Sequence, residues 1–195
     1  KKSNGISNFS TKDSLNINSS FQLASVSKTI TGLATLLLID NGYLSLEDTI
    51  GQFIPNFPYK NIKIKHLLSH RSGLPNYMYF TKDYILQTDT ILNNKDIINL
   101  LMTKIPEKSF VPDTKFAYCN TNYAMLALII EKVTKLSFRN AMNKMIFKPL
   151  GMTNTFVLDF DNEKKKVAPS YKGNRVEIGI DYLDKIYGDK NIYST

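Results

Sequence analysis

Hydrophobic residues along the chain recur mainly with helical spacing and predict a series of helices separated by polar turns. The clearest series begins at about Ser25 and stops at Asn41-Gly42, and its apolar positions are Ile30, Leu33, Ala34, Leu37 and Leu38. Shorter apolar patterns with cap residues predict four more helices. These cover Lys63–Ser69, a stretch capped by Asn94–Asp96, Thr121–Lys132, and a stretch that Ser137 caps and that ends before Pro149.

Polar segments with glycine and proline separate these helices and predict turns and loops. They are Gly42–Asp48, Phe53–Pro58, Arg71–Asn76 and the irregular stretch beyond Asp159. Residues 1–20 are polar and predict an irregular strand or a turn. Phe21–Ala24 is strand-like and leads directly into the first helix. We therefore expect mainly helices and loops over residues 25–155. Strands are expected near the N-terminus, just before Ser25 or after Pro169.

Length and composition indicate a globular chain of one domain or one and a half. The chain has 195 residues, of which 43% are hydrophobic, and this is enough to bury a core. No apolar run approaches the roughly 20 residues that span a bilayer, and no basic-then-apolar leader precedes the fold, so no transmembrane segment is predicted. The single cysteine, Cys119, excludes an intramolecular disulfide and a cysteine-based zinc site.

The positive charge of the chain does not by itself indicate a nucleic-acid partner. The net charge is +8, but the 25 basic residues include only three arginines and the lysines are scattered. The one run, Lys164–Lys166, lies beside Asp161 and Glu163 and is typical of an exposed loop. Nucleic-acid binding is not expected, because a clustered basic face and aromatic recognition motifs are missing.

Ser25 and Lys28 form the pair of residues that says most about chemistry. Residues three apart share one face of a helix, so the Lys28 amine can reach the Ser25 hydroxyl one turn away. A serine with an amine as its proton acceptor is a device for covalent catalysis, and a helix N-terminus favours developing negative charge. The alternative is an N-cap serine followed by a solvated lysine.

Tyr118 and Asn120 form a second candidate site. Tyr118 ends an extended stretch directly before an apolar helix, where a side chain can be presented from a rigid base. The same spacing occurs at Tyr59 and Asn61, but those residues follow Pro58 in a loop. The alternative for Tyr118 is a half-buried aromatic residue at the end of a strand.

Four stretches stand in a characteristic order: Phe21–Lys28, His66–Pro75, Tyr118–Tyr123 and Pro149–Met152, with Gly42–Asp48 as a softer fifth match. With them the chain resembles the serine β-lactamase and penicillin-binding-protein-like family, on the branch of class C β-lactamases, D-alanyl-D-alanine carboxypeptidases and related esterases. The resemblance covers most of residues 20–156. It implies an α+β fold, the β-lactamase/transpeptidase-like sandwich, represented here mainly by its helical region (about 25–155) with an incomplete sheet.

The resemblance also implies roles for four residues. Ser25 would attack a carbonyl and form an acyl-enzyme, Lys28 and Tyr118 would share the general-base and general-acid work, and Asn120 would hydrogen-bond the substrate amide. Tyrosine at the start of the second motif argues against the class A arrangement, which has Ser-Asp-Asn there. The implied substrates are D-Ala-D-Ala-type peptides, β-lactams or esters, with no cofactor and no metal, and the implied location is periplasmic or extracellular.

Two departures from the family pattern stand out. No Lys-Thr-Gly or His-x-Gly follows Tyr118, so we expect residues 1–195 to be one incomplete domain whose second oxyanion N–H lies beyond Thr195. A chain without that donor is expected to acylate weakly. Cys119 occupies a position where a small residue is usual, and a cysteine there is tolerable because it behaves as a small apolar side chain.

Two other functions compete with the serine hydrolase. His66 and His70 are four apart on a predicted helix, a spacing that lets two imidazoles share a metal and would suit a metallohydrolase. No glutamate follows His66 and there is no third histidine, which favours packing or hydrogen-bonding roles for both. The other alternative is a non-catalytic module that binds cell-wall peptide without turning it over. The sequence does not predict an oligomeric state.

Overall fold

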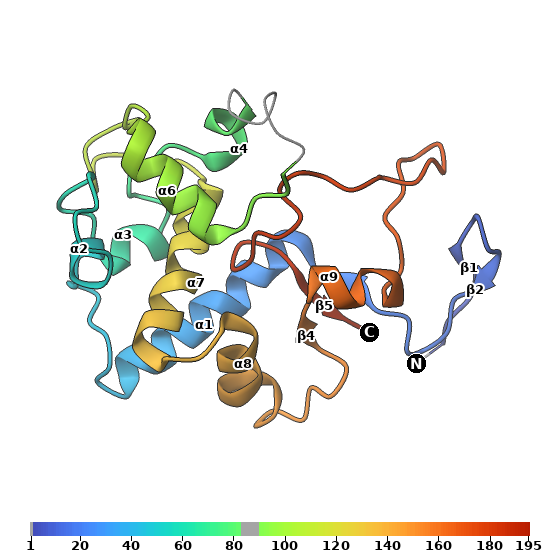
Figure 1. Ribbon diagram of the computed structural model, residues 1–195. Coiled ribbons are helices and arrows are strands. Elements are labelled where there is room, and N and C mark those ends of the chain that lie inside the picture. Colours follow the sequence, from blue (N-terminus) through green and yellow to red (C-terminus); the bar gives the residue numbers. More distant parts are fainter. Residues whose placement is uncertain (1, 83–89) are drawn as a thin grey trace.

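The computed structural model describes residues 2–82 and 90–195, and helices are its main regular elements (Figure 1). The helices of this part are α1 (Ser27–Asp40), α2 (Ile50–Phe53), α3 (Ile64–Leu68), α4 (Tyr77–Phe80), α6 (Asn94–Lys104), α7 (Asn120–Thr134), α8 (Phe138–Met142) and α9 (Phe160–Glu163). Short 3₁₀ turns cover Ala24–Val26 and Lys164–Lys166, and a π-helical turn, Asn143–Phe147, continues α8. None of these helices is long and apolar enough to cross a membrane.

In the described ranges five short strands form two small antiparallel sheets. Strands β1 (Ile6–Asn8) and β2 (Asp13–Ser14) pair with each other at the end of the molecule away from the helices (Figure 1). In the second sheet β5 (Ile192–Ser194) lies between β3 (Phe21–Gln22) and β4 (Phe156–Val157). This arrangement of helices with a small sheet confirms the α+β class.

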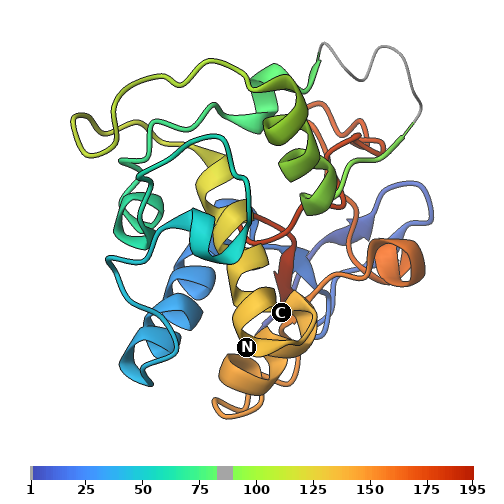
Figure 2. The same cartoon turned by 60° about the vertical axis from the view of Figure 1, so that its left-hand side comes forward.

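Helix α7 is the centre of the fold. Every residue from Asn120 to Ile130 is buried, because α1, α3, α6 and α8 all pack against this helix (Figures 1 and 2). A helix surrounded by other elements needs apolar residues on all its faces, which explains its unbroken hydrophobic run. The N-terminus of α7 thus becomes a fixed platform for the residues that precede it.

The segment around Gly188 crosses the inner helices at very close range. Gly188 has φ +98°, and a Cβ atom there would lie 2.4 Å from the Tyr123 carbonyl oxygen. The Gly188 carbonyl accepts a hydrogen bond from the Thr31 hydroxyl of α1 at 2.7 Å. Glycine is required here because only a residue without a side chain permits both the positive φ and the contact with α7.

The helices expected from sequence are present with small shifts in their ends. The α-helix proper begins at Ser27 and not at Ser25, which lies in the preceding 3₁₀ turn. Helix α6 is capped by Asn93, whose side chain accepts the N–H groups of Lys95 and Asp96. Ser137 caps α8 as expected, by accepting the N–H of Asn140.

Other expectations were wrong. Strand β4 lies between residue 155 and Pro169, outside the regions where strands were expected, because its register is set by pairing with β5 and not by a local pattern. Phe53, assigned to a loop, ends α2, and part of the supposedly irregular stretch beyond Asp159 forms α9. Lys164–Lys166 forms a 3₁₀ turn instead of an open loop.

Candidate active site

Ser25 lies in the short 3₁₀ turn that joins β3 to α1. Ala24, directly before it, has φ +46°, a left-handed conformation that is uncommon for a residue with a side chain. The residues at the N-cap positions are Leu23 for the turn and Val26 for α1, and neither makes a side-chain cap. Ser25 therefore does not cap the helix, and its hydroxyl is available for other partners.

Ser25, Lys28 and Tyr118 converge, as the resemblance to the family implies. The Lys28 Nζ atom lies 3.3 Å from Ser25 Oγ, and the Tyr118 hydroxyl lies 3.0 Å from the same oxygen. Lys28 is buried, with 6% of its surface exposed, and its Nζ lies 5.0 Å from the centre of the Tyr118 ring. A proton can pass between Ser25 and either neighbour across a single hydrogen bond.

His70 and the segment before α7 hold Tyr118 in place. The Ala117 N–H donates to the His70 carbonyl at 2.9 Å, and the Cys119 N–H donates to His70 Nδ1 at 3.1 Å. The His70 ring also packs on the Tyr118 ring, with 4.5 Å between the centroids. The His66–Pro75 stretch thus forms the support on which Tyr118 rests.

Gly73 completes this support. The Ser109 N–H donates to the Gly73 carbonyl, and a Cβ atom at Gly73 would lie 2.1 Å from the Phe110 carbonyl oxygen. Residues 109–117 therefore run against residues 70–73 backbone to backbone. The Ser-Gly sequence at this point allows an approach that a larger residue would block.

The two histidines have hydrogen-bonding and packing roles. His66 Nδ1 accepts the Lys63 N–H at 3.2 Å, and His70 Nδ1 accepts that of Cys119. Burial lowers the pKa of both imidazoles, and for His70 the nearby Lys28 lowers the pKa further. Over the described ranges, 2–82 and 90–195, no three histidine, cysteine or acidic residues are grouped so that they could hold a metal ion. The metallohydrolase reading therefore has no ligand set to support it.

Asn120 lies at the start of α7, close to the converging residues but not joined to them. Its Nδ2 atom contacts the Met78 sulfur of α4, and its Oδ1 atom is buried without a hydrogen-bond partner. In the described part of the chain no hydrogen bond links Asn120 to Ser25, Lys28 or Tyr118. The unpaired Oδ1 can receive a donor, and its contact with a substrate amide stays a prediction.

The sequence analysis missed two buried residues, one that contacts Lys28 and one that contacts the first. The Asp189 carbonyl oxygen accepts a hydrogen bond from Lys28 Nζ at 2.9 Å. The Asp189 carboxyl in turn accepts one from the Tyr77 hydroxyl at 2.6 Å. Neither residue belongs to a motif, so only the fold could identify them.

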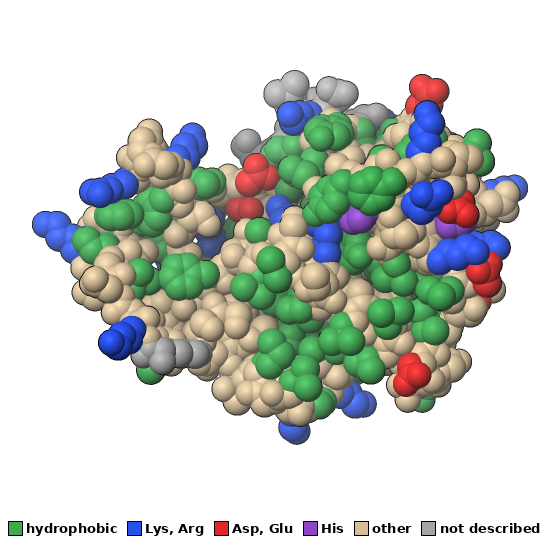
Figure 3. All heavy atoms as spheres, turned by 180° about the vertical axis from the view of Figure 1, so that it is seen from behind, with side chains coloured by type: hydrophobic (Ala, Val, Ile, Leu, Met, Phe, Trp, Pro, Cys, Tyr) green, Lys and Arg blue, Asp and Glu red, His purple; other side chains and the backbone are tan. Residues whose placement is uncertain are grey.

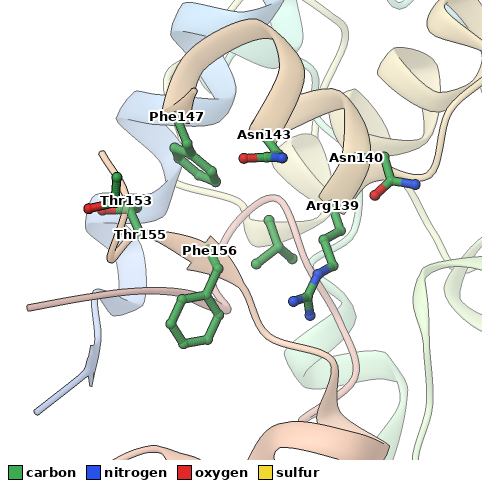
Figure 4. A pocket seen from close by; sticks show the side chains of 8 residues that line it. Arg139, Asn140, Asn143, Phe147, Thr153, Thr155 and Phe156 are labelled. Carbon is green, nitrogen blue, oxygen red and sulfur yellow. The ribbon is translucent and has the colours of Figure 1, made fainter. Parts of the chain in front are cut away.

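A pocket of about 200 Å³ lies elsewhere, between α8 with its following turn and β4 (Figure 4). It contains none of the converging residues. The charged group at its edge, Arg139, is already paired with Glu163 through two hydrogen bonds of 2.5 and 2.8 Å.

The outer surface also carries many hydrophobic side chains on the face opposite to the view of Figure 1 (Figure 3).

An α+β fold in which Ser-x-x-Lys at a helix start meets the tyrosine of Tyr-x-Asn defines the serine β-lactamase and penicillin-binding-protein-like class. The chain belongs to the Beta-lactamase family, whose sequence model matches residues 1–195. It is 40% identical to Penicillin-binding protein 4* of Bacillus subtilis over 154 residues, which cover 78% of this chain and 34% of that protein. It is 33% identical to Protein flp of Staphylococcus aureus over 160 residues, which cover 78% and 31%.

Solved structures agree with this assignment. A penicillin-binding protein from Bacillus halodurans superposes with a TM-score of 0.83 at 27% identity and covers 100% of this chain and 61% of its own. An octameric penicillin-binding protein homologue from Pyrococcus abyssi gives a TM-score of 0.79 at 27% identity, covering 98% and 45%. The chain spans about a third of the length of the curated relatives it matches.

Proposed function

We propose that the whole protein is a serine hydrolase that forms an acyl-enzyme at Ser25. The observation that carries this proposal is the convergence of two proton-transferring groups, Lys28 and Tyr118, on one serine oxygen at 3.3 and 3.0 Å. An unassisted serine hydroxyl is a weak nucleophile, and an adjacent base is what activates it. Membership of the Beta-lactamase family supports the same reaction class.

The reaction begins when Ser25 Oγ bonds to the carbonyl carbon of the substrate. The Ser25 proton passes to the Lys28 amine or to a Tyr118 phenolate, each one hydrogen bond away. The bond from the carbonyl carbon to the amine or alcohol then breaks, and that group leaves with the proton. Water cleaves the resulting ester and restores Ser25. Asn120 binds the substrate amide from the start of α7.

Peptides ending in D-Ala-D-Ala, β-lactams and simple esters are the proposed substrate classes, and a location in the cell envelope or outside the cell fits them. The similar proteins support this choice of substrates, because two of them are named penicillin-binding proteins, both from Bacillus species. All three classes present a carbonyl carbon that a serine oxygen can attack.

Covalent labelling tests the proposal. The protein is incubated with a fluorescent penicillin or an alkyl fluorophosphonate, and adducts are located by intact mass and peptide mapping. We expect one adduct, on Ser25, and none in Ser25→Ala. Equal labelling of both proteins would refute the nucleophile assignment. Reversible binding of cell-wall peptide without any adduct would favour the non-catalytic module.

A further inference from the structure

Asp189 is an acidic residue enclosed in the core directly behind Lys28. Only 2% of its surface is exposed, and its Oδ1 atom has no hydrogen-bond partner in the described part of the chain. Its Oδ2 atom accepts the hydroxyl of Tyr77, which is itself fully buried. Burying polar groups with so few partners is costly, so a packing role alone does not account for this pair.

The main chain of Asp189 contacts the candidate catalytic lysine. Its carbonyl oxygen lies 2.9 Å from Lys28 Nζ, whereas Ser25 Oγ lies 3.3 Å from the same nitrogen. A neutral amine has two protons and one lone pair. With one proton donated to Asp189, the lone pair is left to accept the proton of Ser25.

The residues beside Asp189 are fastened to the same stretch of α1. The Thr31 hydroxyl donates to the Gly188 carbonyl at 2.7 Å, and the Ile192 N–H donates to Ser27 Oγ at 3.2 Å. The Asp189 carbonyl is therefore held from both sides along the chain. The Tyr77 hydroxyl holds the Asp189 side chain from α4, a helix that packs against α7.

We propose that the buried Tyr77–Asp189 pair is a positioning element for Lys28, fixing the carbonyl oxygen that orients the amine toward Ser25. This proposal rests on the proposed function. The side chains act as a neutral anchor: burial raises the pKa of the Asp189 carboxyl and that of the Tyr77 phenol, which favours the uncharged forms of both. The pair touches no substrate and acts only through Lys28.

Other titratable groups near Lys28 also influence whether its amine is protonated, and the variants of the test leave these groups in place. In the described part of the chain, the titratable and charged groups that interact with Lys28 or Asp189 include His70, Tyr118, Tyr123, Cys119 and Lys190, and Asp181 faces Tyr77.

The test compares Tyr77→Phe, Asp189→Ala and Asp189→Asn in the protein by two measurements. One is the rate of Ser25 labelling by a fluorophosphonate across pH, normalised to folded protein. The other is the pH titration of the Lys28 Cε resonance by carbon-13 NMR, assigned with Lys28→Arg. The control is Tyr187→Phe. Tyr187 is partly buried, stands two residues before Asp189 in the sequence, and donates a hydrogen bond of 3.1 Å to the Glu131 carboxylate, which the substitution removes.

We expect Tyr77→Phe and Asp189→Ala to slow labelling about tenfold, the effect of losing one well-placed hydrogen bond. The Cε titration midpoint should move to lower pH, because the ammonium form loses a fixed acceptor. Asp189→Asn should stay within about twofold of wild type, since its amide oxygen still accepts the Tyr77 hydroxyl. Tyr187→Phe should change neither measurement.

Several results would overturn the proposal. Wild-type rates and midpoints in Tyr77→Phe and Asp189→Ala would do so, as would losses no larger than that of Tyr187→Phe. Failure of Asp189→Asn to restore activity would show that the charge of the carboxylate matters and would end the neutral-anchor reading. If even the wild-type protein is not labelled at Ser25, the proposed function fails, while the NMR titration still decides the positioning role.

Discussion

Replacing Gly188 with alanine should destabilise the fold far more than the same change at Gly42 or Gly179. Two penalties add at this position. The backbone has φ +98°, which disfavours a side chain, and the new Cβ atom would lie 2.4 Å from the Tyr123 carbonyl oxygen and 2.7 Å from Ala127 Cβ. The first penalty is about 1 kcal/mol. The second forces the chain away from α7 and costs about 2 kcal/mol more, as overpacking of a dense interior does.

Two other glycines separate these penalties. Gly42 has φ +75° but no atom within 4 Å of a built Cβ, so Gly42→Ala should cost only the backbone part, about 1 kcal/mol. Gly179 has neither a positive φ nor a close neighbour, so Gly179→Ala should be within about 0.5 kcal/mol of wild type. The three variants therefore form a series in which one penalty is added at a time.

The assay is equilibrium unfolding in urea, with thermal unfolding as a second measurement. We expect Gly188→Ala to lower the free energy of unfolding by about 3 kcal/mol, which for a chain of this size lowers Tm by roughly 6–12 °C. A loss no larger than that of Gly42→Ala would refute the close crossing of residue 188 over α7.

Three further predictions concern the candidate site. Tyr118→Phe should slow Ser25 labelling by about two orders of magnitude or more with little effect on reversible binding, measured by comparing labelling rate with ligand affinity. The buried thiol of Cys119, whose pKa is raised by burial, should react with a disulfide reagent about 100-fold more slowly in native than in unfolded protein, and equal rates would contradict its burial. His70 has a pKa lowered first by burial and then by Lys28, so protonation favours the unfolded chain and stability should fall as the pH drops below about 6.5. Urea unfolding at pH 7.5 and 5.5 should show a smaller fall in His70→Gln than in wild type, and an equal fall would assign the effect to other groups.

Local patterns were enough to single out Ser25 with Lys28 and Tyr118 with Asn120, but the meeting of Tyr118 with Ser25 was implied only by the family resemblance. The three-residue spacing of Ser25 and Lys28 needs only a helical turn to bring the two side chains together. Helices α1 and α7 each have a sustained apolar pattern, and their positions follow from it. Tyr118 was identified from its place directly before α7, which the structure bears out.

The remaining features depend on contacts between distant parts of the chain. Tyr77 and Asp189 are 112 residues apart, and neither stands in a stretch with a local pattern. Strand β4 has two residues and exists only because β5 pairs with it. The role of His70 as a support for Tyr118 depends on a left-handed turn at φ +57°, which no short pattern around a non-glycine residue predicts.

The pairing of β3 with β5 has a consequence for the order in which the protein matures. Gln22 and its partner Tyr193 are 171 residues apart, and β3 ends directly before the turn that carries Ser25. Contacts this distant in sequence form late, because the closure entropy of the intervening chain must be overcome first. During synthesis α1 and α7 can pack while Tyr193 is still inside the ribosome. The turn bearing Ser25 gains its β5 partner only after the residues up to Ser194 have emerged, so a nascent chain can be compact before its candidate nucleophile is fixed in place.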